Sequence, residues 1–215
     1  MDERHPGVLP RQRERRDARE NRQRLLAAAK RLFAAQGVDA TSMHEIARTA
    51  GVGQGTLYRH FADKAELCHA LLKEDVAAFQ ERVGAIIDSA AVSPLARLET
   101  LIAEKIRMTE SHLPLFAAIE ETAAGARRTK PFRGPFYTWM RERTVALLAE
   151  AVERGEVAEL DIEFSADAIL AAVAPPLYSH QRHELGYSSG RILAGMRRLF
   201  IDGLRLPAPP PQDGG

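Results

Sequence analysis

The chain has 215 residues, of which 45% are hydrophobic and 27% charged, and it contains one cysteine. This length allows one large or two small domains with a buried core, and the single cysteine excludes an intramolecular disulfide and a cysteine-based metal cluster. The net charge of +1 is unevenly distributed, because residues 1–64 hold 13 Lys and Arg against 8 Asp and Glu, whereas residues 65–215 hold 17 against 21. A basic N-terminal part suits a surface that contacts phosphates.

The first 20 residues are polar and rich in arginine. They lack the apolar stretch of a secretory signal, and no run in the chain approaches the roughly 18 apolar residues of a membrane span. We therefore expect a cytoplasmic protein without a membrane partner, with residues 1–20 disordered. Two interpretations of this segment stay open: a solvated tail, or a basic arm that reaches phosphates or the minor groove through Arg11, Arg13, Arg15 and Arg16.

Two predicted helices precede the most distinctive stretch of the chain. Apolar residues recur at helical spacing over residues 22–36, and the glycine that follows ends this helix. Ser42 and Glu45 have the spacing of a capping box, in which each side chain accepts a hydrogen bond from the backbone N–H of the other residue. Gly51 closes the second helix, because glycine readily adopts the left-handed conformation needed there.

A short third helix is predicted from Gln54 to about Phe61. Leu57 and Phe61 lie four residues apart and therefore face the same, inward side. The other side chains carry amide, hydroxyl, phenol, guanidinium and imidazole groups that suit a DNA groove. Glycines on both sides of Gln54 weaken a helix, but they allow the backbone to approach DNA closely. The segment therefore predicts a helix-turn-helix.

The stretch GVGQGTLYRHFADKAELCHALL, which begins at Gly51, resembles the DNA-binding signature of the TetR family of bacterial transcriptional repressors. A turn glycine, a Thr-Leu-Tyr core, a His-Phe pair and an Asp-Lys step occur in the family's order, and the resemblance extends upstream through the first helix. It implies an all-α fold, with a helix-turn-helix DNA-binding domain at residues 21–66. A larger helical ligand-binding and dimerisation domain is then expected at residues 67–206.

The resemblance and the helix pattern together indicate a set of DNA-binding residues. Some match family positions that typically contact phosphates, some lie where base edges are within reach, and the start of the second helix offers backbone N–H groups to a phosphate. The candidates near phosphates are Thr41, Ser42, Tyr58, His60 and Lys64, those near base edges are Gln54, Thr56 and Arg59, and Gly55 allows close approach of the backbone.

The remainder is expected to be helical, and no convincing strand is found. A second capping box, at Asp63 and Glu66, predicts a long helix to about residue 89 that links the DNA-binding part to the rest. Ser93 and Pro94 are typical of a helix start, and the proline-rich end at residues 207–215 is expected to be disordered. Further helices are expected from Pro114, over Pro135–Gly155, over Ser165–Glu184 with Ser165 as cap and a kink at Pro175-Pro176, and over Ser189–Leu206; a basic loop is expected at Gly125–Pro131.

Apolar and aromatic residues of the middle helices are candidates for a small-molecule site. Taken singly, each is more typical of a plain core, but in the family this helical half encloses a ligand pocket. Such a lining suits a lipophilic or aromatic compound. The candidate ligand-binding residues are Phe79, Met108, His112, Phe116, Phe136, Trp139, Met140 and Tyr178.

Catalytic and metal chemistry is not indicated. His180 and His183 have a spacing that can share a metal, but no third ligand is apparent, so no metal site and no cofactor are expected. No nucleophile–base order, phosphate-binding loop or paired-carboxylate site is recognisable, and an enzyme is not expected.

The last two predicted helices carry apolar stripes with nothing left in the chain to cover them. We expect them to pair with their copies in a homodimer, an arrangement that also resembles the family's. The candidate interface residues are Ile192, Gly195, Met196, Leu199 and Gly203. Two functions stay open: a dimeric repressor that a small-molecule effector releases from a pseudo-palindromic operator in double-stranded DNA, or a DNA-binding regulator without a ligand, controlled by a protein partner or by its abundance.

Overall fold

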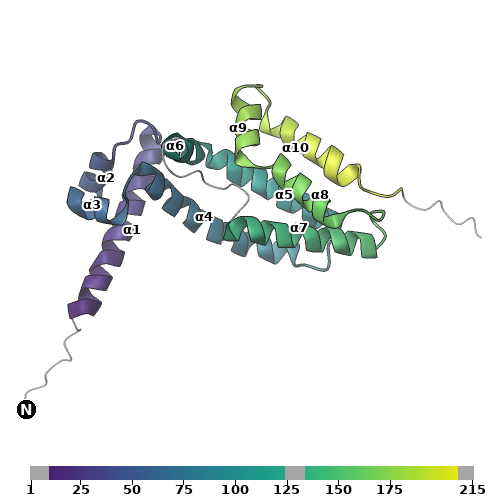
Figure 1. Ribbon diagram of the computed structural model, residues 1–215, viewed down its shortest axis with the longest axis horizontal. Helices are drawn as coiled ribbons and strands as arrows, with labels where there is room; N and C mark the ends of the chain where they lie inside the picture. The colour runs from purple at the N-terminus through teal and green to yellow at the C-terminus, as the bar shows by residue number, and fades with distance from the viewer. Residues whose placement is uncertain (1–9, 124–133, 208–215) are drawn as a thin grey trace, which may run out of the picture. The chain divides into compact units, whose positions relative to one another are not determined.

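The computed structural model describes residues 10–123 and 134–207, and this part of the chain is all-helical apart from turns and one isolated bridge between Val157 and Arg205 (Figure 1). The prediction of an all-α fold is confirmed. In chain order the helices are α1 (Pro10–Gln36), α2 (Met43–Ala50), α3 (Gln54–His60), α4 (Lys64–Ile87), α5 (Pro94–Ser111), α6 (Leu113–Ala123), α7 (Pro135–Glu153), α8 (Ile162–Ala172), α9 (Pro175–His183), α10 (Ser189–Arg197) and the π-helix η1 (Arg198–Asp202).

The helices divide into two compact units. Unit 1 contains α1, α2, α3, the part of α4 up to Glu74, and α6 from Pro114 onward. Unit 2 contains α4 from Asp75, then α5, and the helices from α7 to η1. The expected domain boundary between residues 66 and 67 falls inside α4. The two units divide this helix between Glu74 and Asp75, so α4 contributes residues to both of them.

Unit 1 has a core to which four helices each contribute an apolar stripe. Leu25 of α1, Ile46 of α2, Leu57 of α3 and Leu67 of α4 belong to this cluster and are fully buried. Burial of an aliphatic side chain of this size stabilises a fold by about 1.5–3 kcal/mol. The cluster fixes α3, which has only seven residues and would be unstable as an isolated helix.

Side-chain caps start two helices of unit 1. The Ser42 hydroxyl accepts from the Glu45 N–H at 3.2 Å, and the Glu45 carboxylate accepts from the Ser42 N–H at 3.0 Å, which confirms the first capping box. The second box forms only in half: Asp63 accepts from the Glu66 N–H at 2.8 Å, but the Glu66 carboxylate accepts from the N–H of Ala62 instead of Asp63. The shift by one residue satisfies an N–H just before the helix.

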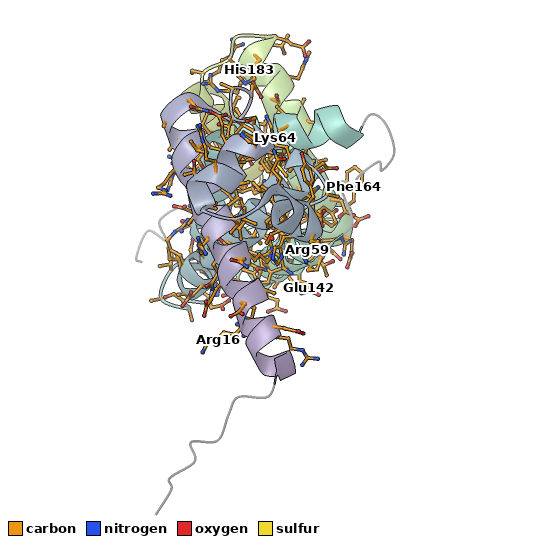
Figure 2. All side chains as sticks on the ribbon, turned by 90° about the vertical axis from the view of Figure 1, so that its left-hand side faces the viewer. Arg16, Arg59, Lys64, Glu142, Phe164 and His183 are labelled. Atoms are coloured by element: carbon orange, nitrogen blue, oxygen red, sulfur yellow. The ribbon has the colours of Figure 1, made fainter. Side chains whose placement is uncertain are left out.

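The first helix starts much earlier than the sequence pattern suggested. We expected it from Arg22, with residues 1–20 disordered, but α1 begins at Pro10. Arg, Glu, Gln and Ala are good helix formers and proline is favourable at the first position, and Arg16 pairs with Glu20 at 3.4 Å one turn later. Figure 2 labels Arg16 near the N-terminal end of α1. Residues 1–9 of the expected arm lie outside the described part.

Helix α6 packs in unit 1, although α5 and α7 on either side of it in sequence belong to unit 2. Its Ala118 and Ile119 are buried together with Val38, Cys68 and Leu72. Burial raises the pKa of the Cys68 thiol to about 11, so the thiol is neutral at pH 7 and acts as a small apolar core group. Part of the chain between α5 and α7 therefore completes the core of unit 1.

Unit 2 has the larger core, built from helices α4, α5 and α7 to η1. Its fully or nearly fully buried members include Phe79, Leu98, Leu148, Ile169 and Tyr178. Ser93 caps α5, with its hydroxyl accepting from the Ala96 N–H at 3.3 Å, as the Ser-Pro step predicts.

Three expectations for the last helices are corrected. The cap of α8 is Asp161, whose carboxylate accepts from the Phe164 N–H at 3.0 Å, and Ser165 already lies within the helix. The expected kink at Pro175 is a break between α8 and α9, because a proline cannot donate to the preceding turn. The last helix leaves the α form after Arg197 and continues as η1 to Asp202. The expected loop at 125–131 and the tail at 208–215 lie outside the described residues.

Within the residues that the structure describes, no helix is both long and apolar enough to cross a bilayer.

Candidate functional site

Helix α3 presents polar side chains on one side and is held by apolar ones on the other. Leu57 is fully buried and Phe61, directly after the helix, is 2% exposed. Tyr58 is 53% exposed, and Gln54 and Arg59 are exposed as well. Because Leu57 and Phe61 hold this seven-residue helix in the core of unit 1, its exposed polar side chains can enter a DNA groove.

The two glycines of this segment face open space. A Cβ atom at Gly53 or at Gly55 would meet no described atom within 4 Å, and neither residue needs a positive φ. Packing among the described residues therefore does not require glycine at either position. What glycine leaves there is an uncovered backbone surface at the start of α3, where an external partner can approach closely.

Two internal contacts orient the side chains that were predicted to face base edges. The Gln54 amide nitrogen lies 2.5 Å from the ring Nδ1 of His44, which belongs to α2. The Arg59 guanidinium donates to the Thr56 hydroxyl at 3.0 Å. His44 was not among the predicted residues, because nothing in the sequence shows that α2 and α3 bring positions 44 and 54 together.

Two other predicted residues make contacts inside unit 1. Thr41 is 1% exposed, and its hydroxyl donates to the carbonyl of Gly37 at 2.7 Å. The Lys64 ammonium donates to the carbonyls of Val38 at 2.8 Å and Asp39 at 3.3 Å. Both side chains thus stabilise the turn between α1 and α2. Figure 2 labels Lys64 and Arg59.

Two further predicted residues, Ser42 and His60, lie at the start of α2 and at the end of α3. Ser42 caps α2, and the hydrogen bonds from its backbone and its side chain hold the pKa of the Glu45 carboxyl below the usual value. His60 is half-buried at the end of α3, with its ring 6.3 Å from that of Phe61.

Arginines of α1 stabilise the helix-turn-helix. Arg24 donates to the carbonyl of Gly51 at 3.1 Å, in the turn between α2 and α3. Arg22 lies over the ring of Phe61, 5.3 Å from its centroid. The first helix thus adds positive charge next to both ends of α3, which favours an anionic partner.

Three of the residues predicted to bind a ligand form one aromatic cluster in unit 2. The ring of Phe79 on α4 is 5.6 Å from that of Phe136 and 6.1 Å from that of Trp139, in edge-to-face arrangements. Phe136 and Trp139 of α7 are stacked at 6.4 Å. We call these three residues the aromatic cluster. Met108 and Met140 are buried in the same core.

The other predicted ligand residues lie elsewhere. Phe116 packs in unit 1, against the cluster that contains Cys68. The ring nitrogens of His112 face acceptor oxygens, the carboxylate of Asp75 at 2.9 Å and the carbonyl of Met108 at 2.7 Å. His112 is therefore part of a polar link between α4 and the end of α5.

Tyr178 is buried in the core of unit 2 with its hydroxyl donating to Glu110. Burial, followed by the hydrogen bond to Glu110, raises the pKa of Tyr178 to about 12. Arg182 donates to both oxygens of the same carboxylate, at 2.8 and 3.0 Å, and to the carbonyl of Tyr187. This network connects α5 with α9 and the turn that follows it.

A buried lysine near the aromatic cluster is absent from the sequence-based prediction. Lys105 of α5 is 8% exposed, and its ammonium donates to the Thr109 hydroxyl at 2.7 Å and lies 5.8 Å from the ring centroid of Phe136. Burial lowers its pKa to about 8. The sequence offers one signal for its burial. Lys105 lies three residues after Ile102 and four after Leu101, so it falls on the same apolar stripe of α5.

The predicted dimer residues divide into buried and exposed ones. Ile192 and Met196 are 6% exposed and belong to the core of unit 2. Gly195 is exposed, and a Cβ there would meet no described atom within 4 Å. Leu199 is 66% exposed. A Cβ at Gly203 would lie 2.7 Å from the carbonyl oxygen of Leu199, so glycine is required by the backbone of η1 itself.

The histidine pair of α9 and its surroundings do not assemble a metal site. His180 lies 3.0 Å from a carboxylate oxygen of Glu184. No group of three or more His, Cys, Asp and Glu residues in the described part of the chain is arranged to hold a metal ion.

Comparison with known proteins places the helix-turn-helix in a family. Residues 25–71 match the family described as bacterial regulatory proteins, tetR family. A curated HTH-type transcriptional regulator of Staphylococcus aureus (strain USA300) is 49% identical over 65 residues, which are 30% of this chain and 35% of that protein. The alignment thus spans about a third of the length of this relative.

Solved structures match over most of the chain. A gamma-butyrolactone receptor, described as ArpA-like, is 30% identical with a TM-score of 0.51, over 88% of this chain and 90% of that one. A TetR-family transcriptional regulator from Pectobacterium atrosepticum is 25% identical with a TM-score of 0.68, over 91% of this chain and 99% of that one. The chain belongs to the TetR family of bacterial regulatory proteins.

Proposed function

We propose that this protein is a transcriptional regulator whose homodimer binds a pseudo-palindromic operator and is released by a small lipophilic ligand. The observation that carries the DNA-binding part is α3, a short helix with Leu57 buried beneath it and Gln54, Tyr58 and Arg59 exposed. Amide and guanidinium groups at such positions read base edges in the major groove, whereas a phenol contacts phosphates.

The contacts within unit 1 refine the roles of the predicted DNA-binding residues. His44 and Thr56 hold the side chains of Gln54 and Arg59, so less side-chain entropy is lost when they meet DNA. Thr41 and Lys64 shape the turn before α2. We propose that Ser42 and His60 lie against the phosphates, at the start of α2 and at the end of α3.

Exposed apolar residues of unit 2 support a homodimer. Phe164 of α8 is 71% exposed, Leu177 of α9 is 42% exposed and Leu199 of η1 is 66% exposed; Figure 2 labels Phe164. Three successive C-terminal helices thus each carry a large exposed apolar side chain, and we propose that these side chains contribute to a surface that associates with a second copy of the chain. Half-sites in successive major grooves require two copies of α3 about 34–36 Å apart, and a two-fold dimer supplies the two copies.

The proposed ligand response rests on the likeness to the gamma-butyrolactone receptor and on the core of unit 2. The aromatic cluster and the neighbouring methionines offer a lipophilic environment. Helix α4 contributes Leu67 and Leu71 to the core of unit 1 and Phe79 and Val83 to the core of unit 2. We propose that a ligand favours a conformation in which α4 displaces the recognition helices from their spacing on DNA.

The DNA-binding proposal can be tested with an operator selected from a random duplex library. Arg59→Ala should reduce the preference for the selected duplex over a scrambled one by about 1–3 kcal/mol, because a bidentate base contact is lost. The control is Arg107→Ala in unit 2, where the arginine is exposed and pairs with Glu104. Fluorescence anisotropy at several salt concentrations measures both affinities. An unchanged preference in Arg59→Ala would show that α3 does not read the duplex through this residue.

A further inference from the structure

Three cationic side chains face the aromatic cluster of unit 2. The Arg82 guanidinium lies 6.0 Å from the ring centroid of Phe79, and that of Arg143 lies 5.9 Å from the ring of Trp139. The Lys105 ammonium lies 5.8 Å from the ring of Phe136. The three differ in exposure, because Arg82 and Arg143 have side chains 58% and 41% exposed, whereas Lys105 is buried.

Among the described residues, the two exposed cations have carboxylate partners and the buried one has none. Arg82 pairs with Glu104 at 3.4 Å, and Arg143 pairs with Asp88 at 2.6 Å. Among the described residues, Lys105 has no carboxylate within ion-pair distance, and its ammonium donates to one protein acceptor, the Thr109 hydroxyl. This order is the reverse of what solvation favours, because water stabilises an exposed charge and a buried charge needs a partner.

A second buried cation of unit 2 follows the usual rule. Arg97 is 5% exposed, pairs with Glu150 at 2.5 Å and donates to the carbonyl of Ile87 at 3.1 Å. The fold can therefore supply a carboxylate to a buried cation, as it does at Arg97, about two helical turns before Lys105 on α5. At Lys105 it supplies a hydroxyl and the face of an aromatic ring instead.

The hydroxyl of Thr109 cannot satisfy the ammonium alone. Thr109 is itself fully buried and donates its own hydrogen to the carbonyl of Lys105 at 2.9 Å, so its oxygen is oriented to accept from Nζ. An ammonium has three N–H donors. One is directed to Thr109, and the remaining positive charge lies toward an apolar, aromatic surrounding.

We propose that Lys105 anchors the carboxylate of a lipophilic ligand whose apolar body packs on Phe79, Phe136 and Trp139. This inference rests on the proposed ligand response and specifies the chemical class of the effector. A monoanion matches the single positive charge. A phosphate dianion would bring a second charge into an apolar site, and a cationic ligand would be repelled by the ammonium.

The protonation of Lys105 makes this anchor dependent on pH. Burial lowers the pKa of the ammonium to about 8, so the group is mainly charged at pH 7 and mainly neutral at pH 9. A carboxylate binds the charged form and raises its pKa in return. Affinity for a carboxylate should therefore be highest below pH 8 and fall as pH rises through it.

The test uses a saturated carboxylate and neutral probes of the same chain length: decanoate, 1-decanol and methyl decanoate. Trp139 is the only tryptophan of the chain, and its stacking on Phe136 makes its fluorescence the readout. Decanoate should bind at pH 7 more tightly than either neutral probe. Between pH 7 and pH 9 its affinity should fall by about tenfold, as the charged fraction of a group with a pKa of about 8 does, whereas that of 1-decanol should not change.

Lys105→Met keeps the length of the side chain and removes the charge. It should weaken decanoate binding by about thirtyfold or more, the usual effect of removing one partner of a buried charge pair, abolish the pH dependence, and leave 1-decanol binding unchanged. Lys73→Met, at an exposed lysine of α4, is the matched control. A purely structural Lys105 would not change the preference for carboxylate over alcohol.

The outcomes separate this inference from the proposed function. Absence of decanoate binding, or equal binding of decanoate and 1-decanol at pH 7, would overturn the anchor, and the wild-type protein alone decides this if Lys105→Met does not fold. Neutral probes that release the operator would leave the ligand-responsive regulator intact without the anchor. Decanoate that binds through Lys105 but leaves operator affinity unchanged would support the anchor and contradict the proposed response.

Discussion

At the residue scale, Lys64 shows how a position matched to phosphate contact can stabilise the domain itself. Its ammonium donates to the carbonyls of Val38 and Asp39, just after α1. Hydrogen bonds from a charged donor are stronger than neutral ones, and these two close the turn that leads into α2. We therefore expect this side chain to affect DNA binding through the position of α2, in addition to any contact of its own with a phosphate.

Lys64→Met should lower the free energy of unfolding by about 1–2 kcal/mol, because both carbonyls lose a charged donor. Thermal denaturation followed by circular dichroism measures this change. Lys73→Met on the same helix serves as the control, since Lys73 is exposed. Equal melting curves for wild type and Lys64→Met would mean that the turn does not depend on this contact.

At the element scale, α3 combines a poor helix sequence with a well-fixed position. Gly55 lies within its seven residues, and glycine lowers helix stability relative to alanine. No described atom would contact a Cβ there. Helix stability and packing against the described residues would both accept alanine, so we propose that the glycine allows DNA to approach α3 closely.

Gly55→Ala should therefore raise the free energy of unfolding by about 0.5–1 kcal/mol and at the same time weaken operator binding. Chemical denaturation and fluorescence anisotropy on the same preparations measure the two quantities. Gly190→Ala is a matched control, because Gly190 also lies within a helix and an added Cβ would meet only the Ser188 hydroxyl, at an ordinary contact distance of 4.0 Å. Gly55→Ala that binds the operator as tightly as wild type would contradict the close approach of the backbone.

Helix positions could largely be predicted from the sequence, because apolar periodicity and caps are local signals. The Ser42 capping box and the start of α5 are examples. Periodicity could not locate the start of α1, since the sequence of residues 10–20 contains no apolar stripe and its helix depends on propensity. It also could not show that α8 is capped by Asp161, because Ser165 has an equally favourable residue type for a cap.

The candidate site was harder to predict, because it depends on contacts between distant residues. Aromatic residues at helical spacing indicated Phe79, Phe136 and Trp139, which do form one cluster. The same reasoning included Phe116, although α6 packs in unit 1. It missed Lys105, because a lysine in an apolar stripe is ordinarily exposed at its tip, and only the packing of α5 and α7 shows that this one is buried.

At the scale of the whole molecule, one continuous helix runs from unit 1 into unit 2. The core of unit 1 holds the recognition helix, the core of unit 2 holds the aromatic cluster, and α4 contributes to both. Exposed Phe164, Leu177 and Leu199 support a dimer, which two half-sites of an operator require. A ligand that prefers a conformation of such a dimer with low operator affinity must, by linkage, bind less tightly when operator DNA is present.

The coupling between effector and operator is tested most directly by titrating an effector with and without operator DNA. Trp139 fluorescence reports the effector, and the anisotropy of a labelled operator duplex reports DNA binding in the same sample. Leu199→Arg, which places charge on the proposed dimer surface, is the control expected to bind effector but to bind operator weakly. We predict that the effector lowers operator affinity and that the operator lowers effector affinity by the same factor. An effector that changes Trp139 fluorescence while both affinities stay independent of each other would contradict the account.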